Sequence, residues 1–317
     1  MKAVGIILAG GNSKRMKELS RKRAISAMPV AGSFRCIDFA LSSMSNSHIQ
    51  TVAVLTQYNS RSLNEHLNSS KWWNFGRKQG GLYLFTPTVT PENSDWYRGT
   101  ADAMYQNIDF LKKRHEPYVV ISSGDCVYKM DFNKVLDFHI EKKADITVVC
   151  KDMMPSVNVS RFGVVRMNED ARIVDFEEKP LMALSNTIST GIYVIRRRQL
   201  IEMLEKAAEE NRYDFVNDII IRYKNVKRIY GYKLNTYWNN IADVTDYFHT
   251  NMDFLKPEVR DFFFRQEPKV YSRVDDLPPA KFNPGSDVSN SLVSSGCIVN
   301  SKVENSVLFK QAFIGKN

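Results

Sequence analysis

A glycine pair followed by two cations is the first group of residues that could perform chemistry. The apolar run Gly5–Ala9 leads into Gly10 and Gly11, and Lys14 and Arg15 come shortly after. A buried strand that ends in exposed backbone N–H groups, with basic side chains beside them, is suited to binding phosphate. The segment fits neither G-x-x-x-x-G-K-[ST] nor G-x-G-x-x-G, so an ordinary strand and turn with surface cations stays open as the alternative.

Carboxylates at two later positions could act on the same ligand. Asp125 comes shortly after the apolar run Val119–Ser122, where a buried strand is expected to end. Glu178 and Lys179 stand next to each other, an arrangement that is also common on protein surfaces. Because the end of a buried strand is a frequent place for ligands, Asp125 is the stronger candidate.

Composition favours small anionic ligands. The chain has 317 residues, 43% of them hydrophobic, and a net charge of +9, which together allow a large core and two domains. The basic residues are spread along the chain, so nucleotides, sugar phosphates or pyrophosphate fit the charge, and we expect no nucleic-acid partner. No apolar run approaches the roughly 20 residues that span a bilayer, so we expect no membrane partner either.

The cysteines and histidines do not indicate a metal site. Four cysteines and five histidines are scattered through the chain without C-x-x-C or triad spacing. This pattern predicts neither a zinc site nor a disulfide framework, and it favours a reducing, cytoplasmic location.

Elements that position these residues can be read from the hydrophobic pattern. Buried strands are expected at residues 4–8, 52–55, 118–122, 146–149 and 192–195. Helices are expected between them, at residues 101–113, 132–142, 199–209 and 216–223, with Thr100 as an N-cap. Buried strands that alternate with helices predict an α/β fold with a mostly parallel sheet.

The C-terminal part has a different character. We predict a first domain at residues 1–254, a linker at 255–280 and a second domain at 281–317. In the last of these, aliphatic residues return about every five to six positions among Ser, Asn and Gly, which suggests the first coils of a β-helix. Because such coils are stable only when several stack, we expect either a truncated end or coils covered by a partner.

Several motifs occur together in a fixed order. They are Leu8-Ala-Gly-Gly-Asn-Ser-Lys-Arg15, Arg35-Cys-Ile-Asp-Phe-Ala-Leu-Ser42, Leu55-Thr-Gln-Tyr58, Trp96-Tyr-Arg-Gly-Thr-Ala-Asp102, Gly124-Asp125, Phe176-Glu-Glu-Lys-Pro180, Ser189-Thr-Gly-Ile-Tyr193, Tyr237-Trp238 and Leu277-Pro-Pro-Ala-Lys-Phe282. Over essentially its whole length the chain resembles bacterial ADP-glucose pyrophosphorylase, the glucose-1-phosphate adenylyltransferase of glycogen biosynthesis. The resemblance implies a Rossmann-like nucleotidyltransferase domain, a left-handed β-helix and a tetramer.

The resemblance also implies a reaction and a role for each motif. The phosphate of glucose 1-phosphate would attack the α-phosphorus of ATP and release pyrophosphate, with Mg²⁺ held between two carboxylates. By resemblance, Arg15 and Asp125 would be catalytic, and Asp125 would hold the metal. The remaining site residues would be Gly10, Gly11, Gly99 and Thr100 for the nucleotide, and Glu178, Lys179, Ser189 and Tyr193 for the sugar phosphate.

Three motifs depart from the family pattern. Where active members read G-G-x-G-T-R-L, this chain has Ser13 and Lys14 in place of the third glycine and the threonine. Ile25 stands where R-A-K-P-A has its lysine. In W-R-D-V-G, Asn239 and Asn240 replace the arginine and the second magnesium carboxylate, so binding of Mg²⁺ by this chain is in doubt. Loss of one electrostatic stabiliser typically costs about 10²- to 10³-fold in rate, which predicts a degenerate site.

This pattern resembles the GlgD-type subunit, which modulates a catalytic GlgC-type partner in a mixed tetramer. Lys22, Arg23 and Arg35 match effector-binding positions for sugar bisphosphates or AMP, and Gln57 and Trp96 match positions that relay effector binding. For Lys22 and Arg23, the alternative is that they are simply exposed cations in a basic loop. The chain could also be a self-sufficient enzyme, a scaffold that binds no ligand, or a hexapeptide-repeat acyltransferase. The last is disfavoured, because the coils are few and contain no histidine.

Overall fold

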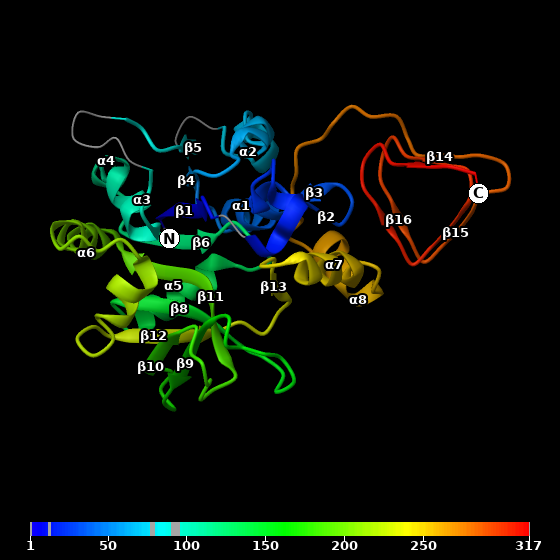
Figure 1. The fold of residues 1–317 in the computed structure, drawn as a ribbon. Coiled ribbons are helices and arrows are strands. Elements are labelled where there is room, and N and C mark those ends of the chain that lie inside the picture. Colours follow the sequence, from blue (N-terminus) through cyan, green and yellow to red (C-terminus); the bar gives the residue numbers. More distant parts are fainter. Residues whose placement is uncertain (1, 12–13, 77–79, 90–95, 317) are drawn as a thin grey trace.

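The computed structural model describes residues 2–11, 14–76, 80–89 and 96–316. Figure 1 shows a large α/β domain and a small C-terminal lobe, joined by an extended segment. The strands of the large domain are β1 (Ala3–Ala9), β2 (Pro29–Val30), β3 (Phe34–Arg35), β4 (Thr51–Thr56), β5 (Gly81–Phe85), β6 (Tyr118–Ser123), β7 (Cys126–Tyr128), β8 (Ile146–Asp152), β9 (Gly163–Met167), β10 (Ile173–Glu178), β11 (Thr187–Arg196), β12 (Ile229–Lys233) and β13 (Trp238–Asn240).

Helices connect most of these strands. The α-helices are α1 (Cys36–Asn46), α2 (Arg61–His66), α3 (Thr100–Gln106), α4 (Ile108–Lys112), α5 (Phe132–Glu141), α6 (Arg197–Glu209), α7 (Val244–Asp253) and α8 (Pro257–Arg260). Short 3₁₀-helices occupy Lys14–Ser20, Ile25–Ala27 and Ser70–Trp73, and π-helical turns occupy Val216–Ile221 and Asp261–Arg265.

The central sheet is mixed. Its path runs β10-β9-β11-β6-β1-β4-β5, with β8 paired to β11 and β12 paired to β8. Strands β6, β1, β4 and β5 are parallel, whereas β11 is antiparallel to both β6 and β8. The mostly parallel α/β class predicted from the sequence is confirmed for this sheet. Two strands, β11 and β10, run against the others. The direction of β11 could not be predicted, because a strand buried on both faces has the same apolar pattern in either direction.

Both faces of the sheet are covered, which explains why its strands are apolar throughout. Ile7 of β1 packs in a core with α1 and α5, whereas Val4 and Ile6 pack in a second core with α3, α4 and α6. Successive side chains of a strand point to opposite faces, so β1 supplies both cores. The glycine loop after β1 is therefore anchored by a strand in the middle of the sheet.

Two expected helices differ in detail. The helix expected at residues 101–113 is divided into α3 and α4 at Asn107, whose side chain hydrogen-bonds the carbonyl of Ala103 and the hydroxyl of Tyr97. The segment expected as a helix at residues 216–223 begins with π-helical turns. Asparagine side chains that bond to the backbone compete with helical hydrogen bonds, which accounts for the first break.

Short parallel ladders build the C-terminal lobe. Its strands are β14 (Lys281–Phe282), β15 (Asp287–Ser289), β16 (Leu292–Val293), β17 (Ile298–Val299), β18 (Lys302–Glu304), β19 (Val307–Leu308) and β20 (Phe313–Ile314). Partners such as Asp287 and Lys302, or Ile298 and Phe313, are 15 positions apart in the chain. Lys281 and Ile298 of the first ladder are 17 positions apart. A nearly constant offset of this kind is what stacked coils require, and the left-handed sense of the coil remains a prediction.

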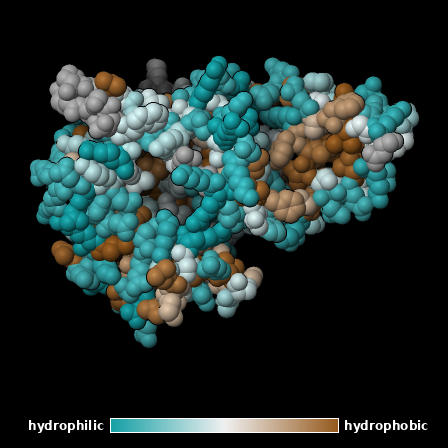
Figure 2. Space-filling view, viewed as in Figure 1, coloured by the Kyte–Doolittle hydropathy of each residue, from teal (hydrophilic) through white to brown (hydrophobic). Residues whose placement is uncertain are grey.

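An aromatic cluster attaches the lobe to the large domain. Phe39, Phe254 and Phe263 are buried together at this junction, and Leu292 of the lobe packs against the same cluster. The ring of Tyr247 on α7 stacks on Phe309, with centroids 6.4 Å apart. The surface is mostly hydrophilic, with apolar side chains gathered on the lobe (Figure 2). No helix in the described ranges is long and apolar enough to cross a membrane.

Candidate active site

A cleft lies at the carboxyl ends of the parallel strands. Its volume is about 800 Å³, and a second cavity of about 320 Å³ adjoins it. Leu8, Thr100, Ser123, Asp125 and Lys179 line both cavities. The carboxyl edge of an open parallel sheet is the usual binding place in α/β proteins, so the position fits a site for substrate-sized ligands.

The glycine loop forms one wall of the larger cavity. Gly10 and Gly11 follow β1 and line the cleft, and a Cβ on Gly11 would meet no atom within 4 Å. Lys14 also lines the cleft, whereas Arg15 is exposed and does not. Lys14 is therefore the cation of this loop that lines the cleft, and the catalytic role expected for Arg15 remains a prediction. Ser13 lies outside the described residues.

Gly99 and Thr100 also line the larger cavity, where the chain closely contacts the backbone of Tyr213. The Tyr213 carbonyl accepts hydrogen bonds from Ala101 N at 2.8 Å and Asp102 N at 3.2 Å. The Thr100 hydroxyl accepts one from Phe215 N at 2.9 Å. Thr100 is thus the first residue of α3 and not its N-cap, which is Gly99. The Thr100 hydroxyl therefore bonds to the segment at Phe215 instead of capping its own helix.

Replacing Gly99 by Ala tests this packing. A Cβ at Gly99 would clash with the Tyr213 carbonyl oxygen, which is fixed in place by the two backbone hydrogen bonds that it accepts. We expect the free energy of unfolding to fall by about 1–3 kcal/mol, because overpacking forces backbone shifts. Denaturant unfolding measures this loss. Gly11→Ala is the matched control on the opposite wall, and an equal effect of both changes would contradict the steric account.

Asp125 lines both cavities, and Asn240 lines the smaller one with it. Strand β13 pairs antiparallel with β7, so Asn240 is opposite Cys126, and Ile241 N donates to the Asp125 carbonyl at 2.9 Å. Asn240 Nδ2 is 3.3 Å from Cys126 Sγ, and the Ser123 hydroxyl donates to Asp125 Oδ1 at 2.5 Å. Burial, and then the charge of Asp125, raises the pKa of the Cys126 thiol, which keeps it protonated.

These residues fit a catalytic Mg²⁺ poorly. Magnesium in phosphoryl-transfer sites is bound by carboxylates together with substrate phosphates. Here Asp125 supplies one carboxylate, one of its oxygens already accepts the Ser123 hydroxyl, and the neighbouring Asn240 offers only a neutral amide. Among the described residues no cluster of three metal-ligating side chains occurs.

Ile25 occupies the wall of the larger cavity next to Ser26. It is 6% exposed and packs in the aromatic cluster that also contains Met16 and Phe39. An apolar side chain at this position cannot stabilise the charge of a phosphate. The cleft thus keeps its shape but lacks a cation at Ile25.

The smaller cavity holds the four residues expected to bind the sugar phosphate. Glu178, Lys179, Ser189 and Tyr193 all line it. Lys179 Nζ is 3.0 Å from Glu178 Oε1, and the hydroxyls of Ser189 and Tyr193 are 3.2 Å apart. Burial raises the pKa of Tyr193, so its phenol stays neutral and can act as a hydrogen-bond donor. The structure brings these residues together with Asp125, and their binding roles remain predictions.

The smaller cavity has further polar residues that the sequence did not single out. Arg161 lines it and makes a two-pronged ion pair with Asp246 of α7, at 2.7 and 2.8 Å. Asp214 also lines it, and buried Trp238 does so with an indole N–H that has no partner among the described residues. Only Trp238 carried a sequence signal, as part of the Tyr237-Trp238 motif. Arg161 and Asp246 are 85 positions apart, so no local sequence pattern predicts their contact.

The expected effector and relay residues lie at separate places. Lys22 is exposed, whereas Arg23 and Arg35 are half-buried near the linker to the lobe. Gln57 lines the larger cavity, and its amide exchanges hydrogen bonds with the backbone of Tyr97 at 2.7 and 3.3 Å. Trp96 is largely exposed and stacks on Tyr58. Gln57 therefore links two loops of the cleft, whereas the three cations lie outside its lining.

Comparison with known proteins gives consistent matches. The nucleotidyl transferase family model matches residues 4–257. A glucose-1-phosphate adenylyltransferase of Pseudothermotoga lettingae is 40% identical, over all of this chain and 76% of the relative. Those of Clostridium acetobutylicum and Thermotoga maritima are 41% and 38% identical over 99% of this chain, which covers 83% and 75% of them.

Proposed function

The chain belongs to the nucleotidyl transferase family, among the glucose-1-phosphate adenylyltransferases, and we propose that it acts there as a modulatory subunit. It would assemble with a catalytic GlgC-type subunit that makes ADP-glucose from ATP and glucose 1-phosphate for glycogen biosynthesis. Alone it would have little activity. The observation that carries the proposal is Asn240, which pairs with Cys126 next to Asp125 in the chain and lines the smaller cavity together with Asp125, where the reaction needs a second carboxylate.

The proposal separates binding from catalysis. The glycine loop, the close contact at Gly99 and the lining of the smaller cavity keep a cleft of the size that a nucleotide and a sugar phosphate require. The charges that would stabilise a transition state are missing at Ile25 and Asn240. Ground-state binding without transition-state stabilisation gives occupancy but little rate. A subunit with these properties can respond to ligands and transmit that response to a partner.

Effector binding is the second part of the proposal. Arg23 and Arg35 are close enough that the charge of Arg23, after burial, lowers the pKa of Arg35. Two like charges held near each other favour binding of an anion, which relieves their repulsion. With Lys22 on the same loop as Arg23, these residues would bind a sugar bisphosphate or AMP. Gln57 and Trp96 would relay the binding to the cleft.

A mixing experiment tests the modulatory role. ADP-glucose formation is measured for the purified chain alone, for the catalytic subunit from the same genome alone, and for the two together. We expect no appreciable formation by this chain, and a raised rate or a changed effector response in the mixture. Robust turnover by the chain alone would reverse the assignment in favour of a self-sufficient enzyme.

Ligand binding distinguishes the modulatory subunit from a scaffold that binds no ligand. Calorimetric titration of the chain with ATP and with glucose 1-phosphate should show binding, because the two cavities retain the expected polar residues. A scaffold that binds no ligand would give no heat with either compound. It would still change the partner's rate in the mixing experiment.

A further inference from the structure

Arg161 lines the smaller cavity, but its ion-pair partners are not among the described residues of that lining. Its two terminal nitrogens are 2.7 and 2.8 Å from the carboxylate oxygens of Asp246, and Nη1 is 3.6 Å from Asp243 Oδ2. Both carboxylates stand at the start of α7. The Arg161 side chain keeps 26% of its surface exposed. One guanidinium therefore has two carboxylates beside it, and within this group of three one negative charge is left unbalanced.

The start of α7 stabilises both carboxylates without help from Arg161. Asp243 is the N-cap, and its Oδ1 accepts the backbone N–H of Asp246 at 2.8 Å. Asp246 Oδ2 accepts the backbone N–H of Ala242 at 3.3 Å. Negative side chains near the first turn are also favoured by the helix dipole. Asp246 can therefore lose Arg161 and keep a partner, so this ion pair can open without unfolding the helix.

The charges inside the smaller cavity leave the phosphate of a ligand short of a cation. The described carboxylates that line it are Asp125, Glu178 and Asp214, and its described cations are Lys179 and Arg161. Lys179 Nζ is 3.0 Å from Glu178 Oε1, so its charge is offset within the cavity. A phosphate monoester carries about 1.5 to 2 negative charges at neutral pH, and it needs a cation to enter such a place. Of the two cations, Arg161 is the one whose partner lies outside the described lining.

We propose that Arg161 is a latent phosphate-binding residue of the smaller cavity, which a hexose phosphate engages by taking the place of Asp246. This inference rests on the sugar-phosphate binding in the proposed function, and it adds Arg161 and a competing carboxylate to that site. The guanidinium fork fits the oxygens of phosphate and of carboxylate, so the exchange replaces one two-pronged pair with another. A neutral sugar offers no negative charge to compete with Asp246, so the ligand must carry the phosphate. The cavity volume of about 320 Å³ suits a ligand of this size.

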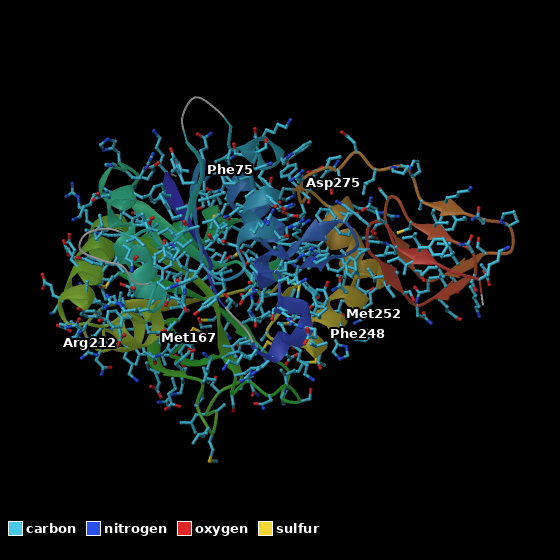
Figure 3. All side chains as sticks on the ribbon, turned by 45° about the horizontal axis from the view of Figure 1, so that its top comes forward. Phe75, Met167, Arg212, Phe248, Met252 and Asp275 are labelled. Carbon is cyan, nitrogen blue, oxygen red and sulfur yellow. The ribbon has the colours of Figure 1, made fainter. Side chains whose placement is uncertain are left out.

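Helix α7 connects this ion pair to the C-terminal lobe. It lies between the large domain and the lobe, and Figure 3 labels Met252 on it. Tyr247, next to Asp246 in the chain, stacks on Phe309 of the lobe, with ring centroids 6.4 Å apart. The Tyr247 hydroxyl also donates to the Pro29 carbonyl at 2.8 Å. A shift of α7 when Asp246 loses Arg161 would therefore change the contact with the lobe directly.

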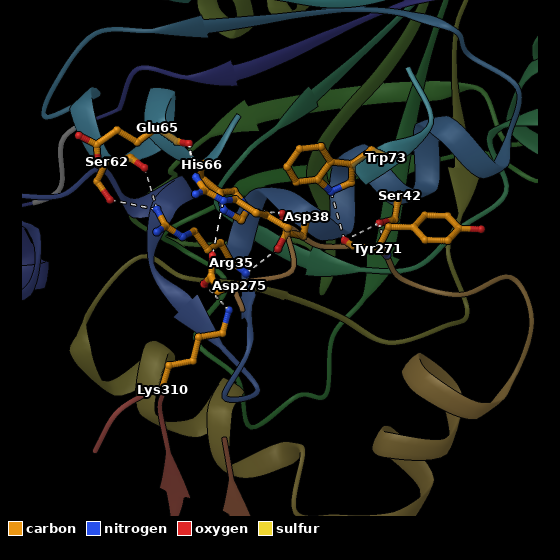
Figure 4. Close-up of polar contacts among 11 residues, drawn as sticks. Arg35, Asp38, Ser42, Ser62, Glu65, His66, Trp73, Tyr271, Asp275 and Lys310 are labelled. Carbon is orange, nitrogen blue, oxygen red and sulfur yellow. Dashed lines mark hydrogen bonds and ion pairs between the residues drawn. The ribbon is translucent and has the colours of Figure 1, made fainter. Parts of the chain in front are cut away.

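A second attachment of the lobe does not involve α7. Lys310 of the lobe donates to Asp275 Oδ2 in the extended segment at 2.8 Å (Figure 4). Neither residue is among the described residues that line the smaller cavity. Lys310→Met therefore loosens the lobe and leaves the Arg161–Asp246 pair intact, so it is the control for effects that come from attachment of the lobe alone.

The first test measures the affinity of the full chain for glucose 1-phosphate by calorimetry, with glucose as the neutral comparison. Asp246→Asn should tighten binding of glucose 1-phosphate about tenfold, because Arg161 is then released to the cavity, and Arg161→Met should weaken it about tenfold. The affinity for glucose should stay the same. Asp253→Asn is the matched control, because it removes the same charge from the far end of α7, where Asp253 accepts from the Tyr237 hydroxyl. Thermal unfolding of each variant shows that it is folded.

A second test follows the lobe by hydrogen–deuterium exchange of residues 307–314, with and without glucose 1-phosphate. The ligand should change the exchange of these amides in the unaltered chain and in Lys310→Met. It should not do so in Asp246→Asn, where no ion pair is left to open. The same ligand-dependent change in Asp246→Asn would contradict transmission through α7.

The outcomes distinguish this inference from the function on which it rests. Binding of glucose 1-phosphate that is tighter in Asp246→Asn but unchanged in Asp253→Asn supports the exchange at Arg161, also when the unaltered chain binds too weakly to measure. Equal affinities of the unaltered chain and Asp246→Asn, or an equal gain in Asp253→Asn, would overturn the inference and leave sugar-phosphate binding itself standing. No binding by any of these proteins would overturn both.

Discussion

Replacing Ile25 by Lys and Asn240 by Asp together is expected to raise ADP-glucose synthesis by the chain alone about 10²- to 10³-fold. Asn240 lies opposite Cys126 and lines the smaller cavity with Asp125, so an aspartate there would give that cavity a second carboxylate in place of a neutral amide. The introduced lysine would put an ammonium group at the wall of the larger cavity, with its aliphatic stem covering the surface that Ile25 now covers. The rate is measured as ADP-glucose formed from ATP and glucose 1-phosphate.

A neighbouring position provides the control for this gain. Asn239→Asp adds the same charge one residue earlier, but the Asn239 side chain donates to the Thr250 hydroxyl at 2.7 Å, on the side of α7. We expect no gain from it. The single variants Ile25→Lys and Asn240→Asp should each give less than the pair, because groups that act on one transition state are not additive. If the unaltered chain turned over rapidly and Asn240→Asp left the rate unchanged, the site would not be degenerate.

The sequence predicts the parts of the site that follow from strand ends. Gly10, Gly11 and Asp125 come after apolar runs that are strands buried on both faces, so their place at the carboxyl edge follows from the pattern alone. The sugar-phosphate residues were assigned through motif resemblance, and they do line one cavity with Asp125. These features are local or carried by short motifs, which is why they could be predicted without coordinates.

Contacts between distant segments could not be predicted in this way. The pairs Arg161–Asp246 and Asp275–Lys310 join positions far apart in the chain, and each partner alone resembles an ordinary surface charge. The N-cap role predicted for Thr100 was wrong for a similar reason, since its hydroxyl partner, Phe215, belongs to another element. Local propensity decides which residues form a helix, whereas tertiary packing decides where a polar side chain finds its partner.

The second large effect is expected from loss of the Asp38 carboxylate. The Asp38 side chain is fully buried, and it accepts the backbone N–H of Arg35 at 2.7 Å and pairs with His66 Nε2 at 2.7 Å. The His66 ring packs edge-on against the buried indole of Trp73, which leaves it little room to find another partner. Asp38→Ala would therefore deprive the buried His66 imidazole and the half-buried Arg35 N–H of this partner, next to the cavity left by the side chain.

We expect Asp38→Ala to lower the free energy of unfolding by about 3–5 kcal/mol, the typical cost of breaking a buried pair by removing one partner. Denaturant unfolding at constant pH measures it. Asp131→Ala is the control, because Asp131 caps α5 by accepting from Asn133 N and its loss should cost only about 1 kcal/mol. Adding His66→Phe to Asp38→Ala should recover part of the loss, since the unpaired imidazole is then gone. Equal losses for the Asp38 and Asp131 variants would show that the buried pair does not hold α2 against α1.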